Sequence, residues 1–497
     1  MAENETPAAT GPADHPSAGA TAARAVTTAP RPAATADTDP RTLFRVDTAP
    51  RSIVNAVREY VARLRGGDPG ALPAVLGLLV LGVIFASTTP DFLTKLNIAN
   101  LTAQASFIAL IALGLVFVLL IGEIDLSAGT TGGLCAAFAA QALASKSLHG
   151  AVGSWVFFGL VVGMLGAVVL AVLNRLWAPA VIVALGVILL VTGGEHSHTL
   201  LAFFFAVSIG VMVGIYSGVL VAQLGIPSFI VTLALFLAWE GVELFALNNQ
   251  SISTGNYSLW FNLTHGTMKP WEGWLLFVVL AGGYLVFTLV RSRLRQRAGL
   301  SYDDLSLVLI RAGVIIVLAG FATYFLNLNR SNSPTLKIEG VPWAASIPIL
   351  IMVIWTLALS KTTWGRHLYA IGGNAEAARR AGIRVNQVKI SAFVICSGMA
   401  AVGGLFLADY SGGATTALGQ GDTLLFAVAA AVIGGTSLFG GRGKPRDAII
   451  GALVIAIIPN GVHLHELPEN LNEVITGGVL LLAASVDAVS RRRSRVR

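Results

Sequence analysis

Few groups of polar side chains in this sequence have the spacing that catalysis or nucleotide binding requires. Gly443-Lys444-Pro445 does not complete the phosphate-cradling motif G-x-x-x-x-G-K-[ST], because Leu438 replaces its first glycine and Pro445 its hydroxyl residue. His463-Leu464-His465-Glu466 lacks the H-E-x-x-H spacing of a zinc site. No Ser, His and Asp set falls on a strand-to-helix elbow. These residues favour no enzymatic reaction, no metal site and no nucleotide site in this chain.

The composition excludes most soluble proteins. Of the 497 residues, 55% are apolar and only 12% are charged, against about 25% charged in an ordinary soluble domain. The 33 basic and 26 acidic residues give a net charge of +7, but no basic stripe interleaved with aromatic residues suggests nucleic acid. The two cysteines, Cys135 and Cys396, lie far apart in apolar surroundings and predict no disulfide framework. Much of the surface must therefore face lipid.

Apolar runs of membrane-crossing length recur from residue 71 onward. A helix needs about 20 residues to cross about 30 Å of hydrocarbon. Fourteen segments are predicted to cross: 71–89, 104–122, 127–145, 153–173, 177–193, 199–222, 228–247, 273–290, 305–326, 344–360, 388–408, 422–439, 447–460 and 472–488. The pair between residues 153 and 193 is the least secure. The predicted fold is therefore an all-α polytopic membrane protein with 12 to 14 transmembrane helices.

Basic clusters divide the chain and orient it. Residues 1–50 are predicted to form a disordered cytoplasmic tail, 51–70 a basic interfacial segment, 71–490 the transmembrane domain and 491–497 a basic cytoplasmic tail. With fourteen spans and a cytoplasmic N-terminus, the Arg291 to Arg297 cluster and the loop 361–389 both fall on the cytoplasmic side, as the positive-inside rule requires. Both termini are then cytoplasmic.

The loop 361–389 has its own local structure. Gly372-Gly373-Asn374 predicts a turn with freedom for positive φ, followed by a short helix over 375–381 and a cap at Gly382. Arg379, Arg380 and Arg384 would project from it. Two interpretations stay open: a docking surface for a partner, and a simple basic loop that orients the spans.

A weak internal similarity raises the hypothesis of a parallel repeat. Residues 121–129 and 433–441 match at an Ile, two Gly and a Leu. Both segments follow spans that are predicted to run inward, so a repeat would be parallel and not inverted.

Four strings carry a family resemblance: GEIDLSAGTTGG (122–133), GIPSFIVTL (225–233), GRHLYAIGGNAEAARRAGIRV (365–385) and AVIGGTSLFGGRG (431–443). They resemble the permease subunits of bacterial sugar ABC importers, of the ribose and xylose type within the branched-chain amino acid/ribose permease superfamily. The likeness covers most of residues 91–490, and the span at 305–326 looks more like the xylose type than the shorter ribose type.

The resemblance implies a permease that imports a simple sugar, such as the pentose D-xylose, through the bacterial cytoplasmic membrane by alternating access. Implied partners are a separate ABC ATPase that holds ATP and Mg, an extracytoplasmic sugar-binding protein, a second permease copy and membrane lipid. No cofactor is expected in this chain, and no nucleic acid as a partner.

The resemblance also nominates two groups of functional residues. The first group is the ATPase-coupling loop: Gly372, Gly373, Asn374, Glu376, Ala377, Ala378, Arg379 and Gly382. The second group is the translocation or core signature: Glu123, Asp125, Ser127, Pro227, Ser228, Thr232, Gly434, Gly435, Thr436 and Ser437.

The resemblance leaves three questions open. Asp125 can cap the next helix through amide groups or contact sugar directly. Family members commonly carry an acidic E-L-D string where this chain has Leu424-Leu425-Phe426, with Asp422 the nearest carboxylate. The family pattern does not assign the stretch from residue 153 to 193, which leaves open an inserted hairpin of two spans.

Two other functions remain as alternatives. An ion-coupled secondary transporter of a small polar solute would need ionisable residues inside spans, and Glu240 and Glu243 lie near one predicted span end. A membrane enzyme acting on lipid-linked substrates would need clustered Asp or His residues, and the pair Asp303-Asp304 is too little.

Overall fold

The computed structural model describes residues 52–65, 70–331 and 335–465, with the isolated positions 333, 468, 471, 474, 475, 477, 478 and 481. The predicted tails at 1–50 and 491–497 lie outside the described residues, as does most of the predicted span at 472–488. The predicted interfacial segment contains the helix α1 (Ile53–Arg65).

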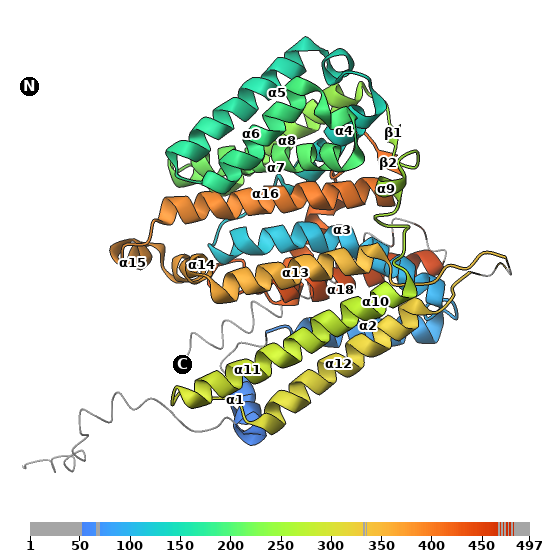
Figure 1. Cartoon of the computed structure of the whole chain (residues 1–497), viewed down its shortest axis with the longest axis vertical. Coiled ribbons are helices and arrows are strands. Elements are labelled where there is room, and N and C mark those ends of the chain that lie inside the picture. The colour runs from blue at the N-terminus through green and yellow to red at the C-terminus, as the bar shows by residue number, and fades with distance from the viewer. Residues whose placement is uncertain are drawn as a thin grey trace, which may run out of the picture.

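The described chain is a bundle of helices, as predicted (Figure 1). Nine of the described helices are long and apolar enough to cross a membrane. Its main helices are α2 (Leu72–Thr88), α3 (Lys95–Leu120), α4 (Ala128–Ala144), α5 (Leu148–Leu173), α6 (Trp177–Thr192), α7 (Thr199–Ala222), α8 (Ser228–Leu247), α10 (Pro270–Phe277), α11 (Gly283–Arg297), α12 (Leu305–Asn327), α13 (Trp343–Lys361), α16 (Val385–Tyr410), α17 (Asp422–Gly434) and α18 (Pro445–Leu464).

Helices α3, α7 and α16 form the centre of the bundle. Glycines let their backbones approach closely: a Cβ atom on Gly114 of α3 would lie 2.8 Å from the Cys396 carbonyl oxygen of α16. A Cβ atom on Gly214 of α7 would lie 2.5 Å from the Val394 Cα atom of α16. Small residues at helix contacts are the usual means of packing in membranes, where no hydrophobic effect drives helices together.

Two hairpins flank this centre. Helices α5 and α6 pack on each other and on α7, so the uncertain stretch at 153–193 does form two helices. On the other side, α10, a π turn (Val278–Gly282) and α11 form one long arm that packs against α12 (Figure 1). The predicted span at 273–290 therefore extends further in both directions.

The predicted span at 422–439 is wrong in its length. Helix α17 ends at Gly434, where the backbone leaves the helix, and Gly435 follows with φ +124°. Residues 435–444 then form an irregular loop that leads into α18.

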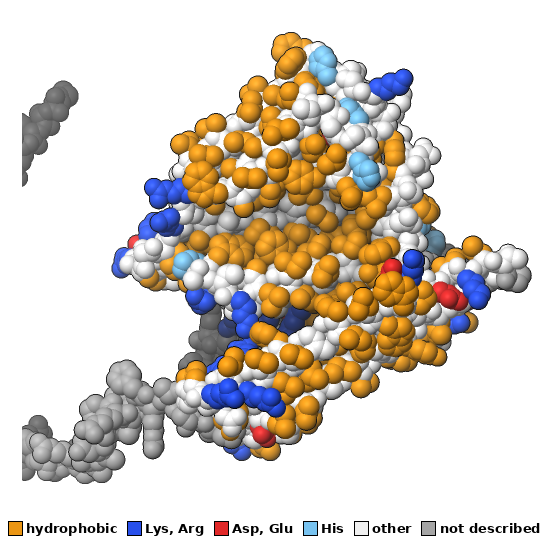
Figure 2. All heavy atoms as spheres, viewed as in Figure 1, with side chains coloured by type: hydrophobic (Ala, Val, Ile, Leu, Met, Phe, Trp, Pro, Cys, Tyr) orange, Lys and Arg blue, Asp and Glu red, His pale blue; other side chains and the backbone are white. Residues whose placement is uncertain are grey.

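The two ends of the bundle differ in charge. Lys and Arg side chains gather at the end formed by α14 (Thr363–Gly373), α15 (Ala375–Arg380) and the last turn of α11, which we call the basic end (Figures 1 and 2). Hydrophobic side chains cover most of the face between the ends (Figure 2). At the opposite end, called the far end, β1 (Ile252–Ser253) pairs with β2 (Gly413–Ala414) in antiparallel register.

Candidate functional site

Three of the four family strings meet at the basic end in one tight contact, which we call the inner junction. It consists of Leu120, Gly122, Gly372, Gly440 and Gly441. The Gly441 amide donates a hydrogen bond to the Leu120 carbonyl oxygen at 2.8 Å. A Cβ atom on Gly372 would lie 1.8 Å from that same oxygen and 2.5 Å from the Gly441 nitrogen. Only glycine fits at residue 372.

The junction also fixes the backbone of its loops. Gly122 and Gly440 have φ values of +77° and +85°, a region that costs other residues energy. The Tyr369 hydroxyl of α14 donates to the Gly443 carbonyl oxygen at 2.7 Å. Helix α14 is thereby held against the two loops that end α3 and α17.

A short projecting helix follows this junction directly. Asn374 lies between α14 and α15, and its side-chain oxygen accepts a hydrogen bond from the Ala377 amide at 2.9 Å. This is the usual N-cap interaction. Gly382, with φ +84°, ends the turn after α15, and the Ile383 amide donates to the Ala378 carbonyl oxygen. The predicted helix and its glycine cap are confirmed.

The predicted glycine turn is wrong. Gly372 and Gly373 form the last residues of α14 and are not among the positive-φ residues. Gly372 serves close packing, whereas a Cβ atom on Gly373 would meet nothing within 4 Å. Sequence alone does not separate a glycine needed for space from one needed for φ.

Helix α15 presents charge to its surroundings. Glu376 pairs with Arg379 at 3.5 Å and with Arg380 at 3.3 Å, and all three side chains are more than half exposed. Ala378 is buried and faces the bundle. Such exposed ion pairs contribute little to folding, so these side chains are available to a partner surface.

Glu123 and Asp125 have different roles. The Glu123 carboxylate pairs with the Lys389 ammonium of α16 at 2.5 Å, and both side chains are mostly buried. Asp125 is fully buried, and its Oδ1 accepts from the Ser127 amide at 2.9 Å and from the Ser127 hydroxyl at 2.7 Å. Because Ser127 is the N-cap residue of α4 and α4 has no side-chain cap bond, Asp125 fixes the turn before α4 and does not cap its first-turn amides. Its full burial keeps it from a solute in this conformation.

The second predicted string packs against the first. The Ile124 amide donates to the Ser228 hydroxyl at 3.2 Å, and the Thr232 hydroxyl donates to the Ser228 carbonyl oxygen at 2.9 Å. Pro227 precedes α8 as its N-cap residue. These residues hold the segment that follows α3 against the first turn of α8.

Residues 434–437 form the turn after α17. A Cβ atom on Gly434 would lie 1.8 Å from the Asp447 carbonyl oxygen. The Thr436 amide donates to the Ala431 carbonyl oxygen at 3.0 Å, and the Ser437 amide donates to the Arg442 carbonyl oxygen at 2.8 Å. Both side chains are buried. In this conformation, these residues shape a loop and are not exposed to a solute.

Leu424 and Leu425, in the string at which the resemblance leads us to expect acids, are apolar and differ in exposure. Leu424 is buried, and its Cβ atom lies 3.3 Å from where a Gly129 Cβ atom would be. Leu425 is 56% exposed. A carboxylate in place of Leu424 would be buried against α4, which is costly without a partner.

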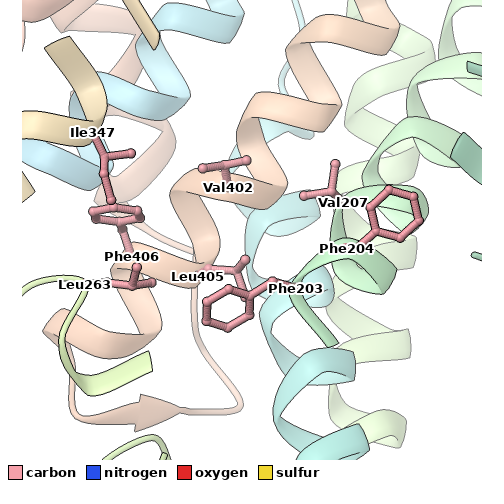
Figure 3. A pocket seen from close by; sticks show the side chains of 8 residues that line it. All are labelled: Phe203, Phe204, Val207, Leu263, Ile347, Val402, Leu405 and Phe406. Atoms are coloured by element: carbon pink, nitrogen blue, oxygen red, sulfur yellow. The ribbon is translucent and has the colours of Figure 1, made fainter. Parts of the chain in front are cut away.

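A hollow of about 280 Å³ lies between α7, α13 and α16 (Figure 3). Its lining is apolar: Phe203, Phe204, Val207, Leu263, Ile347, Val402, Leu405 and Phe406. A sugar site needs hydrogen-bonding groups, so this hollow is unsuited to sugar. Among the described residues, no group of three His, Cys, Asp or Glu side chains could hold a metal ion.

The pairing of Lys389 and the burial of Glu243 do not follow from the sequence alone. Lys389 belongs to the basic loop 361–389 in the sequence, yet its ammonium pairs with the Glu123 carboxylate. Glu243 of α8 is fully buried, and neither carboxylate oxygen has a hydrogen-bond partner in the described part of the chain. The signal for Lys389 was a lone Glu beside an apolar span, which calls for a basic partner.

Comparison with known proteins shows that the chain is similar to membrane permeases. Residues 178–484 match the family described as branched-chain amino acid transport system / permease component. The xylose transport system permease protein of Haemophilus influenzae is 30% identical over 428 residues, which cover 85% of this chain and 98% of that protein. The Escherichia coli K12 xylose permease is 29% identical over 84% of this chain and 92% of its own length. The ribose import permease of that strain is 25% identical over 83% of this chain and 92% of its own length. No solved structure matches the chain.

Proposed function

We propose that this chain, which belongs to the branched-chain amino acid transport system permease family, is the membrane-spanning permease subunit of an ABC sugar importer. D-xylose is the substrate that its relatives indicate. The observation that carries the proposal is the 30% identity to a xylose permease over 98% of that permease's length. The chain is a multi-pass protein of the cytoplasmic membrane and a transport component.

The proposed partners follow from the family and from the basic end. A separate ATPase subunit would bind ATP and Mg, and an extracytoplasmic binding protein would deliver the sugar. We assign the basic end and both termini to the cytoplasm by the positive-inside rule. A second permease copy and surrounding lipid complete the proposed assembly.

We assign the coupling of ATP hydrolysis to transport to α15. The helix is short, exposed and charged. Helix α14 attaches it to the inner junction, where the backbones are in direct contact. Movement of a partner against α15 would be transmitted to the ends of α3 and α17. ATP binding would shift the permease between outward and inward states because those states contact the ATPase differently.

The ion-coupled alternative is not favoured by family membership. Glu243 is an ionisable residue inside a helix, but it is fully buried in this conformation. An ion relay would require a path to that carboxylate.

Uptake of radiolabelled xylose and ribose into vesicles tests the proposal. The vesicles contain this chain with or without the ATPase and the binding protein, ATP is supplied, and an uncoupler collapses the proton gradient. We expect xylose uptake that requires ATP and both partners and that survives the uncoupler. Uptake by this chain alone that the uncoupler abolishes would establish a secondary transporter instead.

A further inference from the structure

Helices α4 and α17 are among the described helices that are shorter than the hydrocarbon is thick. Helix α17 has 13 residues and α4 has 17, which correspond to about 20 Å and about 26 Å of length, against about 30 Å of hydrocarbon. Their first turns meet. A Cβ atom on Gly129 of α4 would lie 2.4 Å from the Gly419 carbonyl oxygen and 3.3 Å from the Leu424 Cβ atom.

The distance of this meeting point from the far end can be measured along α16. A Cβ atom on Gly132 would lie 2.7 Å from the Ala400 carbonyl oxygen and 3.2 Å from the Gly404 Cα atom. These residues precede the end of α16 at Tyr410 by six to ten positions, or roughly 9 to 15 Å. Helix α4 runs from here to the far end, where the Ala142 carbonyl oxygen contacts His196. Gly129 therefore lies at least as far from the far end as Gly132 does.

The chain reaches this depth through irregular backbone. After β2 at the far end, residues 415–421 form turns and include Gly419 and Gly421 at φ +77° and +59°. Irregular backbone at membrane depth is tolerated only when it is buried in protein or lines a water-filled cavity. We call residues 415–422 the outer break.

The outer break is not fully buried. Ala417, Gly421 and Asp422 are exposed, and Gln420 is half-buried. A carboxylate that faced hydrocarbon at this depth would be costly, and charged residues in spans usually face a cavity or a partner. The exposed side of the outer break therefore faces a water-filled cavity or a partner, and not hydrocarbon.

A second polar group lies behind the outer break. Glu243 Oε1 and the Leu418 carbonyl oxygen lie 3.0 Å and 2.0 Å from where a Gly133 Cβ atom would be. Neither Glu243 oxygen has a hydrogen-bond partner among the described residues. The Gln420 side-chain nitrogen donates to the Thr416 carbonyl oxygen at 3.0 Å and keeps a second proton to donate. The outer break thus presents an exposed carboxylate and a half-buried amide, and the buried Glu243 carboxyl of α8 lies beside Leu418.

We propose that the outer break lines the sugar path, and that the Asp422 carboxylate and the Gln420 amide hydrogen-bond to sugar hydroxyls as the substrate passes. A polyol offers several hydroxyls in a row, which suits a carboxylate beside an amide. This inference rests on the proposed function, because it takes a sugar as the solute.

Cysteine labelling tests whether the outer break is wet. The assembled transporter carries Asp422→Cys and is treated from outside with a charged, membrane-impermeant thiol reagent. The native Cys135 and Cys396 are fully buried and give little background. The control is Val317→Cys, in the middle of α12 and 69% exposed. A thiol in lipid ionises poorly, so we expect residue 422 to react about tenfold faster than residue 317.

Substrate protection tests the contact with sugar. Xylose with its binding protein is expected to slow labelling at residue 422 about threefold or more, because bound sugar covers the thiol. Equal labelling at residues 422 and 317 would overturn the aqueous path. Fast labelling that xylose leaves unchanged would overturn the sugar contact.

Transport kinetics separate this inference from the proposed function. Asp422→Asn is expected to raise the KM for uptake about tenfold while the ATPase rate stimulated by the binding protein stays within twofold. Asp422→Glu is expected to restore part of the loss. An unchanged KM in Asp422→Asn, with ATP-driven xylose uptake by the native chain, would refute the contact and leave the proposed function standing. Absence of ATP-driven uptake by the native chain would refute the proposed function itself.

Discussion

The inner junction and helix α15 are neighbours in sequence, but they are built in opposite ways. At the inner junction, the backbones of two loops and the end of α14 touch, and a single added carbon at Gly372 would overlap the Leu120 carbonyl oxygen. On α15, the charged side chains are more than half exposed and pair only with each other. The comparison separates a part that must be rigid to transmit movement from a part that must be accessible to receive it.

The largest expected effect comes from filling the inner junction. Gly372→Ala would force Leu120 or Gly441 to move, and overpacking of this kind costs about 1 to 3 kcal/mol or more. We expect little folded protein in detergent and a thermal transition lowered by several degrees. Gly373→Ala is the matched control, since its Cβ atom would meet nothing within 4 Å. Equal stability of the two variants would contradict the close contact.

The next prediction reduces transport without changing the stability of the fold. Reversal of the exposed charges by Arg379→Glu with Arg380→Glu is expected to reduce ATP-driven uptake about tenfold or more, because α15 would then repel its docking surface. The free energy of unfolding should change by less than about 0.5 kcal/mol. Uptake and co-purification with the ATPase are the measurements. Normal values of both would show that α15 is only a topogenic segment.

A smaller effect is expected at Gly382, where glycine is needed for a positive φ and not for close packing. Gly382→Ala places a side chain at φ +84°, at a cost of about 1 to 2 kcal/mol. Because nothing lies within 4 Å of its Cβ position, the strain should loosen the end of α15 and leave the bundle intact. Hydrogen exchange over 375–383 should rise, while exchange in α3 and α16 should not. Asn is tolerated at such φ values, so Gly382→Asn should recover much of the protection.

The smallest effect is expected from the N-cap of α15. Asn374→Ala removes the hydrogen bond to the Ala377 amide and should cost about 1 kcal/mol of local helix stability. Uptake is expected to fall about twofold, whereas Asn374→Asp should behave like the native chain. A drop in uptake as large as that of the charge reversal would mean that Asn374 itself contacts a partner.

Sequence predicted the type of fold well because apolar run length and loop charge are local signals. It predicted the α15 cap for the same reason, since Asn374 and Gly382 act within one turn. It did not predict the role of Gly372, which depends on Leu120, 252 positions earlier in the chain. It also made α17 too long, because apolar residues continue past Gly434 while the backbone turns.

The proposed parallel repeat stays a prediction. The segments after α3 and after α17 do meet at the same end of the bundle, as a parallel repeat requires, and a Cβ atom on Gly440 would lie 3.0 Å from the Gly122 nitrogen. Shared direction is consistent with a repeat but does not require a common origin.

The hairpin of α10, α11 and α12 has a consequence for how such chains change in evolution. It adds one crossing in each direction, so every later helix keeps its orientation whether the hairpin is present or not. A single added crossing would instead invert α13 through α18 and move α15 to the opposite side of the membrane. Gain or loss of spans in antiparallel pairs therefore keeps α15 on the same side of the membrane. An insertion in this architecture is limited more by whether its number of crossings is even than by its length.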